Sequence, residues 1–355
     1  MIIKSHFKNY DVTFKKEYDF LKSYFGKKET FFVIDKKVYE LYKSKIFNGL
    51  DSEKYILIDA EETNKNIQTV LDICEVMTKL DAKRNIHLIS VGGGIIQDIT
   101  GLAANILYRG INWTFVPTTL LAACDSCIGG KTSLNYKSFK NLLGTFYPPD
   151  HIIICTKILK TLTENDFKSG LGEVVKFNIM YGEEGIHRME ENISSLLSRD
   201  EVLVAEFIKT SLEFKKTYIE FDEFDKGMRI HLNFAHTFGH AIESVTKYEI
   251  PHGTAVAMGT IIANYISYSR GYLDHTIIKR IEKILLQIIP TNYDIFSINT
   301  NNIMTAIRKD KKQTDIKLKA VLFDENMKLK VYNNIQNQEI EDAFSYFKEL
   351  MHECN

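Results

Sequence analysis

The pattern of apolar and polar residues divides the chain into two parts. In the first part, short apolar runs rich in Val and Ile alternate with longer amphipathic stretches. The apolar runs occupy residues 30–35, 54–59, 85–91, 112–118 and 151–156. Runs of this length, separated by helical stretches, are typical of a mainly parallel sheet that is covered by helices. The first part therefore predicts an α/β domain.

The second part of the chain has a helical pattern. From about residue 159 onward, long segments with the 3.6-residue period of a helix dominate, such as residues 201–220 and 251–270. One strand-like run, KLKAVLF at residues 317–323, is the exception. Apart from this run we expect an all-helical C-terminal domain. The change of pattern divides the chain into residues 1–160 and 161–355.

Length and composition narrow the class of protein. A chain of 355 residues exceeds what one core usually organises, which agrees with two domains. The 45 basic and 46 acidic residues nearly cancel, which argues against nucleic acid or an anionic membrane as partner. The N-terminal segment MIIKSHFKNYDVTFKKEYDF lacks the apolar region of an export signal, and no apolar run is long enough to cross a membrane. We expect a soluble, cytoplasmic protein.

The cysteines do not form a disulfide framework. Five Cys, at positions 74, 124, 127, 155 and 354, are odd in number and spread through the chain. Cys124 and Cys127 form a C-x-x-C pair, but no second pair completes a zinc site. We interpret this pair as small residues of a packed turn in a protein from a reducing compartment.

The glycine-rich segment GGGIIQD, residues 92–98, follows an apolar run and opens into a helical stretch. Glycines at such a turn let backbone N–H groups approach an anion, and the helix N-terminus adds a favourable partial charge. This arrangement suits a pyrophosphate. The segment does not match the G-x-G-x-x-G fingerprint, so a tight turn without a ligand is the alternative.

A second glycine pair precedes a basic segment, GGKTSLNYKSFKN at residues 129–141. Its Lys131, Lys137, Lys140 and Asn141 suit a phosphate and a polyhydroxylated ligand. GGKT resembles the end of a P-loop, but Asp125 stands where that motif needs its first Gly, which argues against an ordinary ATPase. A solvated basic turn is the alternative.

Histidines in the second part are candidate metal ligands. His236 and His240 are four residues apart and share one face of a predicted helix, as zinc-binding pairs do, and His252 follows further along. No Glu follows His236, so the H-E-x-x-H pattern of metalloproteases is missing. Histidines of the core or of a helix cap are the alternative.

A fourth segment, GLGEVVKF at residues 170–177, places Glu173 and Lys176 three apart on one helical face among apolar neighbours. An ion pair along the helix is one interpretation. The other is a metal-binding carboxylate beside a substrate-binding ammonium group. The later run RKDKK, residues 308–312, is typical of a solvated surface.

Taken together and in this order, these segments resemble the 3-dehydroquinate synthase family of sugar phosphate cyclases. The similarity runs nearly continuously from residue 92 to residue 259, through GGGIIQD, YRG, VPTTLLA, DS-IGGKT--N, KNLLGTFYPP, SGLGEVVKF, LNFAHTFGHAIE and HGTAVAMG. The resemblance implies an N-terminal dinucleotide-binding α/β domain and a C-terminal helical metal-binding domain, with the active site between them.

The resemblance also implies the site residues. Glu173, His236 and His252 would hold a divalent metal, zinc or cobalt, which leaves His240 facing the substrate and replaces the simple pairing of His236 with His240. Positions that match NAD contacts are Asp35, Glu62, Lys65, Gly94, Ile95, Ile96, Gln97, Asp98, Thr118, Thr119, Asp125 and Lys140. Positions that match substrate contacts are Lys131, Asn141, Lys176, Lys215, Arg229, Asn233, His240 and one lysine of the pair at 311 and 312, taken as Lys311. Arg109 matches the arginine that reaches the phosphate across a homodimer interface.

The activity that the resemblance implies is conversion of 3-deoxy-D-arabino-heptulosonate 7-phosphate to 3-dehydroquinate and phosphate, a step of the shikimate pathway. Family members use NAD transiently: a hydroxyl is oxidised, phosphate is eliminated, the hydride returns, and an intramolecular aldol reaction closes the ring. Arg229 offers a fork for a carboxylate, which together with Lys215 and Asn233 favours a sugar acid as substrate. The alternatives are a cyclase of the amino-dehydroquinate or 2-deoxy-scyllo-inosose synthase type, and, from other classes, an iron-dependent alcohol dehydrogenase or a non-catalytic nucleotide-binding module.

The sequence departs from the family pattern at several positions near these motifs. Tyr136 stands at a position that is usually His, and Phe139 replaces a Gly. Ala235 replaces the Gly of GHT, and Thr254 replaces the Glu of HGE. The expected metal ligands are unaffected, so these departures bear on the substrate and on NAD affinity.

Overall fold

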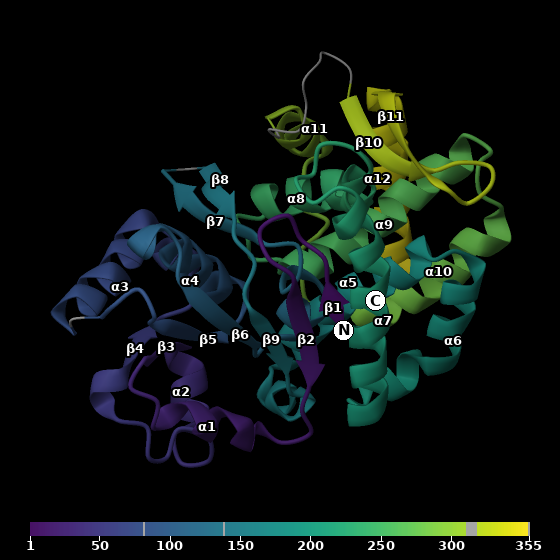
Figure 1. Ribbon diagram of the computed structural model, residues 1–355. Helices are drawn as coiled ribbons and strands as arrows, with labels where there is room; N and C mark the ends of the chain where they lie inside the picture. The colour runs from purple at the N-terminus through teal and green to yellow at the C-terminus, as the bar shows by residue number, and fades with distance from the viewer. Residues whose placement is uncertain (81, 138, 310–317, 354–355) are drawn as a thin grey trace. The chain divides into compact units, whose positions relative to one another are not determined.

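The computed structural model describes residues 1–80, 82–137, 139–309 and 318–353. The chain forms two compact units, Met1–Leu162 and Thr163–Asn355 (Figure 1). The first is an α/β unit and the second is a helical unit, so the predicted fold class is confirmed.

The first unit is built on a seven-stranded sheet. All neighbouring strands run parallel except the first pair, which is antiparallel. In spatial order the strands are β1 (Ile2–Ile3), β2 (Tyr10–Phe14), β9 (His151–Ile154), β6 (Asn112–Pro117), β5 (His87–Gly92), β3 (Thr30–Asp35) and β4 (Tyr55–Ile58). The five strands that the apolar runs predicted are therefore confirmed. Strands β1 and β2 were not predicted, because two apolar residues and an alternating YDVTF segment give a weak signal.

Both faces of this sheet are buried, which explains why its strands are continuous apolar runs. On β3, Phe32 and Ile34 point into one core and Phe31 and Val33 point to the opposite face. Figure 1 shows helices on both sides of the sheet. The helices are α1 (Lys22–Phe25), α2 (Lys36–Tyr42), α3 (Ile67–Lys79) and α4 (Gly94–Ile106).

The two glycine motifs take different structures. The first forms the predicted turn, because β5 ends at Gly92 and α4 begins at Gly94. The second is an antiparallel hairpin of β7 (Lys131–Tyr136) and β8 (Phe139–Phe146), which packs against α4. Between the motifs, Cys124 and Cys127 are buried in and beside a π-helical turn, Ala122–Ser126, and neither forms a disulfide with another described cysteine. They belong to a packed turn, as predicted.

The second unit consists of helices around one central helix. Helix α9 is buried along most of its length and packs against α5, α8, α10 and α12. The helices are α5 (Glu164–Met180), α6 (Glu183–Leu197), α7 (Glu201–Phe221), α8 (His236–Val245), α9 (His252–Ser269), α10 (His275–Ile288), α11 (Thr300–Lys309) and α12 (Asn337–Glu353). None of the helices among the described residues has the length and apolar content needed to span a bilayer.

An antiparallel hairpin interrupts the helices of this unit. The strand-like run noted in the sequence forms β10 (Leu318–Phe323), and it pairs with β11 (Leu329–Ile335). The expectation of an all-helical domain was therefore too simple. Strand β11 escaped detection because most of its side chains are at least partly exposed, which leaves no apolar run to recognise.

Three helices of this unit cross at glycines. A Cβ on Gly172 of α5 would lie 2.0 Å from the carbonyl oxygen of Gly253 in α9, and a Cβ on Gly253 would lie 1.8 Å from the carbonyl oxygen of Ser169. A Cβ on Gly259 of α9 would lie 2.5 Å from the carbonyl oxygen of Ala235, which precedes α8. Ser169 adds a direct link, since its hydroxyl accepts a hydrogen bond from the Gly253 amide at 3.1 Å. The backbones of α5 and α8 therefore lie directly against α9.

Ala235 enters α8 in the left-handed conformation, with φ of 67° and ψ of −22°. This conformation costs an L-residue about 1–2 kcal/mol, because its Cβ approaches the following carbonyl oxygen. The Gly of the family pattern avoids this cost. The departure at this position therefore introduces backbone strain directly before His236.

Replacing Gly253 with Ala is expected to lower the free energy of unfolding by about 2 kcal/mol or more, because the new Cβ would have to displace the Ser169 backbone. Denaturant unfolding followed by circular dichroism measures this. The control is Gly26→Ala, where nothing lies within 4 Å of the new Cβ. Its effect should stay below about 0.5 kcal/mol. A Gly253→Ala protein as stable as this control would contradict the close crossing.

Ala235→Gly should leave the free energy of unfolding within about 0.5 kcal/mol of the parent protein, because relief of left-handed strain offsets the loss of a buried methyl group. The matched control is Ala241→Gly, inside α8 and also buried. It should lose about 2 kcal/mol, since helix propensity and methyl burial both decrease there. Equal losses in the two variants would show that Ala235 is not strained.

Candidate functional site

The structure brings Glu173, His236 and His252 together in the second unit. Glu173 lies within α5, while His236 and His252 are the first residues of α8 and α9. The Nε2 atoms of His236 and His252 lie 3.3 and 3.4 Å from the same Glu173 oxygen, Oε1. The Glu173 side chain is fully buried. Three residues separated by up to 79 positions therefore converge on one point.

Hydrogen bonds at the far side of each imidazole fix its orientation. His236 Nδ1 lies 3.0 Å from the Phe234 carbonyl oxygen, and His252 Nδ1 lies 2.9 Å from Glu243 Oε2. A carbonyl and a carboxylate only accept hydrogen bonds, so each Nδ1 carries the proton and donates it. In a neutral ring the remaining nitrogen, Nε2, then presents a lone pair. Each Nε2 faces the anionic oxygen of Glu173, so the arrangement needs a proton or a metal ion between the nitrogen and that oxygen.

The residues fit a divalent metal. In a tetrahedral zinc site with ligands at about 2.1 Å, neighbouring ligand atoms lie about 3.4 Å apart, as the carboxylate and imidazole atoms do here. Within the described residues, Oε1 of Glu173 accepts no regular hydrogen bond, while Oε2 contacts the Lys176 ammonium. One carboxylate and two imidazoles, each imidazole held by a partner at its other nitrogen, form a donor set typical of catalytic zinc sites.

The protonation states follow from the surroundings. Burial would raise the pKa of Glu173, but Lys176 and His236 outweigh it and hold this pKa well below its usual range. Burial, with Lys176 nearby, lowers the pKa of His236 to about 3, so this ring is neutral. Burial also opposes a charge on His252, but Glu243 and Glu173 outweigh it and raise the pKa of His252 to about 10. The second ring proton of His252 therefore supplies the positive charge beside Glu173, and a metal ion that bound there would have to displace it.

Lys176 and His240 complete this cluster. The Lys176 ammonium lies 2.6 Å from Oε2 of Glu173 and donates to the Leu232 carbonyl at 3.1 Å, so the predicted ion pair along the helix is present. Each of His236, His240 and His252 offers one ring nitrogen, and these three atoms all lie within 4.8 Å of one another. Both ligand sets considered from the sequence are thus present in one place.

The remaining predicted substrate residues of this unit lie on α7 and on a short 3-10 helix, η7 (Met228–Asn233), which contacts α7. Lys215 of α7 and Arg229 of η7 are buried cations. The Arg229 guanidinium donates to the Glu223 carbonyl, and its backbone amide donates to Asp222 Oδ2 at 3.0 Å. Asn233 is the last residue of η7. Lys311 and Lys312 lie outside the described residues.

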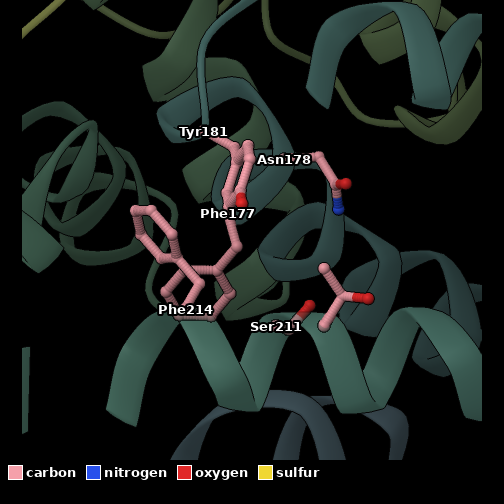
Figure 2. A pocket seen from close by; sticks show the side chains of 6 residues that line it. Phe177, Asn178, Tyr181, Ser211 and Phe214 are labelled. Atoms are coloured by element: carbon pink, nitrogen blue, oxygen red, sulfur yellow. The ribbon is translucent and has the colours of Figure 1, made fainter. Parts of the chain in front are cut away.

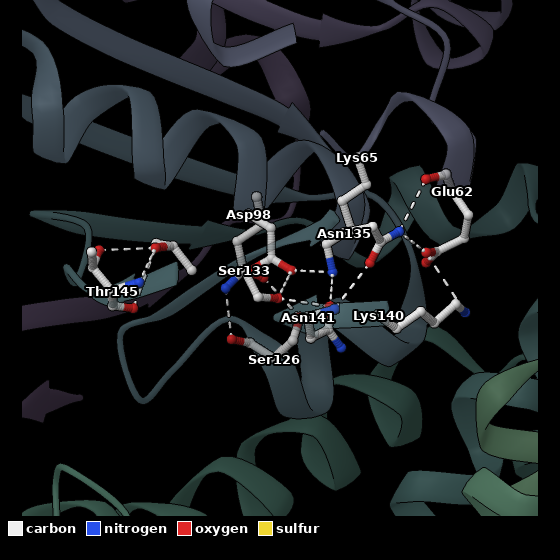
Figure 3. A network of polar contacts seen from close by, with 11 residues as sticks. Glu62, Lys65, Asp98, Ser126, Ser133, Asn135, Lys140, Asn141 and Thr145 are labelled. Carbon is white, nitrogen blue, oxygen red and sulfur yellow. Dashed lines mark hydrogen bonds and ion pairs between the residues drawn. The ribbon is translucent and has the colours of Figure 1, made fainter. Parts of the chain in front are cut away.

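A second polar cluster lies in the first unit (Figure 3). The Lys65 ammonium contacts Asp98 Oδ2 at 2.5 Å and Asn141 Oδ1 at 2.7 Å. Lys140 lies 3.6 Å from Glu62 Oε2. Burial raises the pKa of the Asp98 carboxyl, while Lys65 acts in the opposite direction. The structure thus brings together residues of the start of α4, of the segment before α3 and of the hairpin.

Sequence reasoning missed two residues of this cluster. The Ser133 hydroxyl lies 2.8 Å from Asp98 Oδ2 and 2.9 Å from Asn141 Oδ1. Asn135 donates to Glu62 Oε2 at 2.7 Å and accepts from the Asn141 amide at 3.0 Å. The signal was present as an alternation, because Thr132 and Leu134 of β7 are buried while Ser133 and Asn135 share the other face.

The other predicted positions of the first unit lie at strand ends and helix starts. Asp35 follows the core of β3 and caps α2 by accepting from the Lys37 amide at 2.9 Å. The Gln97 side chain and Ser126 exchange two hydrogen bonds of 2.7 Å, which join the first turn of α4 to the π-helical turn with Asp125. Thr118 and Thr119 follow β6. Arg109 is exposed and has φ of 62°.

A small hollow in the second unit lies away from the predicted residues. Figure 2 shows its aromatic wall. It is lined by residues of α5 and α7 and by the residue that follows α5: Phe177, Asn178, Tyr181, Thr210, Ser211 and Phe214. No predicted site residue lines it, and the rings of Phe177 and Tyr181 pack on Phe214 at centroid distances of 6.0 and 5.9 Å. Packing between two helices accounts for this feature.

Comparisons with known proteins identify relatives of the whole chain. A 3-dehydroquinate synthase from Clostridium tetani is 39% identical over 315 residues, which cover 88% of this chain and 84% of the relative. The crystal structure of 2-deoxy-scyllo-inosose synthase complexed with carbaglucose-6-phosphate, NAD⁺ and Co²⁺ has a TM-score of 0.86 at 24% identity and covers 97% of this chain and 98% of that one. The structure of 2-epi-5-epi-valiolone synthase from Streptomyces hygroscopicus with NAD⁺ and Zn²⁺ has a TM-score of 0.82 at 23% identity and covers 96% and 97%.

Family models match both parts of the chain. The model described as 3-dehydroquinate synthase N-terminal matches residues 55–169, and the model described as 3-dehydroquinate synthase C-terminal matches residues 170–313. The match extends beyond residues 92–259, over which the sequence motifs were recognised. The resemblance stated from the sequence is confirmed. Together with the close relative, these matches show that the chain belongs to the 3-dehydroquinate synthase family of sugar phosphate cyclases.

Proposed function

We propose that this protein is a 3-dehydroquinate synthase, which converts 3-deoxy-D-arabino-heptulosonate 7-phosphate to 3-dehydroquinate and phosphate in the shikimate pathway. The observation that carries the proposal is the convergence of Glu173, His236 and His252, with two lone pairs and a carboxylate oxygen directed at one point. The identity to a relative of that name over most of the chain supports the same substrate.

The proposal includes two bound groups. Glu173, His236 and His252 would hold zinc or cobalt, as the names of structurally similar cyclases suggest. Asp98, Lys65 and Lys140, with the glycine turn before α4, would hold NAD. When bound, the metal supplies Lewis acidity at a substrate hydroxyl, and NAD accepts a hydride and returns it, so no NADH accumulates.

The remaining residues would bind and orient the substrate. Lys131 and Asn141 offer an ammonium and an amide to the phosphate, and Arg229 offers a planar fork to the carboxylate. His240 lies beside His236 and His252, and Lys176 contacts Glu173. Asn233 precedes His236 by three residues in the sequence. Such positioning fixes the conformation of a flexible intermediate before ring closure.

We also propose that the enzyme is a cytoplasmic homodimer. In this dimer, Arg109 of each subunit would bind the phosphate of the substrate held by the other subunit. Arg109 is exposed, so its guanidinium is accessible to a second subunit. The size of the species in solution would test whether the chain is a dimer. The activity of dimers that combine Arg109→Ala and parent subunits would test whether Arg109 acts in the partner's site.

The reaction is tested by incubating the purified chain with the sugar acid, NAD and Zn²⁺. Phosphate release should accompany formation of 3-dehydroquinate, identified by NMR, while absorbance of NADH stays unchanged over many turnovers. Turnover of a neutral heptulose or hexose phosphate in place of the acid would assign a different cyclase activity. Net NADH formation would indicate a dehydrogenase.

Removing the metal is expected to abolish phosphate release, and added Zn²⁺ or Co²⁺ should restore it. Glu173→Gln should lower kcat/KM more than about 100-fold, because loss of several kcal/mol of Lewis-acid stabilisation accompanies loss of the metal. Glu164→Gln on the same helix is the control, since Glu164 pairs with Lys168 at an exposed position. Full activity in the presence of a strong chelator would refute the metal assignment.

Arg229→Lys should lower kcat/KM for the sugar acid about 10- to 100-fold, because a single ammonium cannot replace the two parallel hydrogen bonds of a guanidinium. Arg188→Lys is the matched control, because Arg188 pairs with Glu206 and lies outside the predicted site. Steady-state kinetics with a phosphate assay measure both variants. An unchanged kcat/KM in Arg229→Lys would remove Arg229 from carboxylate recognition.

A further inference from the structure

Glu243 is a buried carboxylate to which neither the motifs nor the family assignment gave a role. It lies on α8, seven residues after His236 and three after His240, so the three side chains follow one stripe of the helix. Its side chain is buried, and Oε2 accepts the Nδ1 proton of His252 at 2.9 Å. The helix that begins with His236 therefore also supplies the partner of the third residue of the cluster.

We propose that Glu243 is a positioning residue that holds the His252 ring in the tautomer and orientation required for metal binding. The proposal rests on the metal site of the proposed function. His252 begins α9 after Pro251, a residue that makes no side-chain hydrogen bond at this helix start. The hydrogen bond to Glu243 places the proton on Nδ1 and directs Nε2 to Glu173 Oε1, 3.4 Å away. A carboxylate that accepts a hydrogen bond from one nitrogen of an imidazole also raises the basicity of the other nitrogen, which makes that nitrogen a stronger metal ligand.

The two imidazoles of the cluster are supported differently. His236 donates to a neutral backbone carbonyl two residues away, so the local backbone conformation fixes the orientation of its ring. His252 depends on a side chain from another helix. A change at position 243 should therefore affect His252 and leave His236 in place.

Glu243 also joins α8 to α9, so a purely structural role must be distinguished from positioning. Helix α9 is already fixed to α5 by the Ser169–Gly253 hydrogen bond and by close contact at Gly172 and Gly253. The isosteric variant Glu243→Gln preserves the size of the side chain and removes its charge. If the role of Glu243 is structural, this variant should have lower thermal stability and unchanged zinc affinity. If Glu243 positions His252, the variant should have unchanged thermal stability and lower zinc affinity.

The experiment measures the zinc dissociation constant of the full chain by competition with a chromophoric chelator. Glu243→Gln should bind zinc about 10- to 100-fold more weakly than the parent chain. The control Glu249→Gln makes the same change of charge at an exposed position after the same helix, and it should stay within about twofold. The absorption bands of bound Co²⁺ should shift in Glu243→Gln and remain unchanged in the control.

The outcomes separate this inference from the proposed function. Parent-like zinc affinity and cobalt bands in Glu243→Gln would overturn the inference. A parent chain that binds no zinc would overturn both the inference and the metal site. A parent chain that binds zinc but does not convert the sugar acid would refute only the substrate, and a weakened Glu243→Gln site would still support the role of Glu243.

Discussion

An ionised carboxylate that is shut off from water is the constraint around which the second unit is built. Glu173 is fully buried, and burying an uncompensated carboxylate costs several kcal/mol. Lys176, one turn along the same helix, compensates Oε2. Oε1 instead faces the Nε2 atoms of His236 and His252, whose orientations are fixed from behind. A cation at that point would stabilise all three groups together.

Close packing of the helices at small residues brings Glu173, His236 and His252 together. Because Gly172 and Gly253 allow α5 and α9 to touch backbone to backbone, Glu173 comes within ligand distance of the first residue of α9. The contact of Gly259 with the Ala235 carbonyl does the same for α8. Both imidazoles stand at helix N-termini, where the helix direction is set by these crossings. Larger side chains at the crossings would separate the ligands, so packing and chemistry depend on the same residues.

The sequence predicted the elements whose signal is local. Buried parallel strands read as apolar runs, and the helical spacing of Glu173 and Lys176 predicted their ion pair. Local pattern could not show which candidate residues converge. The i,i+4 spacing paired His236 with His240, and the family resemblance instead grouped Glu173, His236 and His252 as one set. Glu243 escaped notice because its partner lies on another helix. Strand β11 and the β7–β8 hairpin escaped because their faces are largely polar or exposed.

The two polar clusters differ in a way that bears on what each can bind. In the first unit, Lys65 supplies a positive charge to Asp98, and exposed groups such as Asn141 make hydrogen bonds that a ligand can exchange for its own. Exchange of this kind suits an organic molecule that binds and leaves. In the second unit the Nε2 atoms of His236 and His252 face one carboxylate oxygen of Glu173, and the hydrogen bonds at their Nδ1 atoms hold both rings in place. An arrangement of this kind suits a compact cation better than an organic ligand, because a metal ion that replaced the His252 proton would satisfy several acceptors at one point.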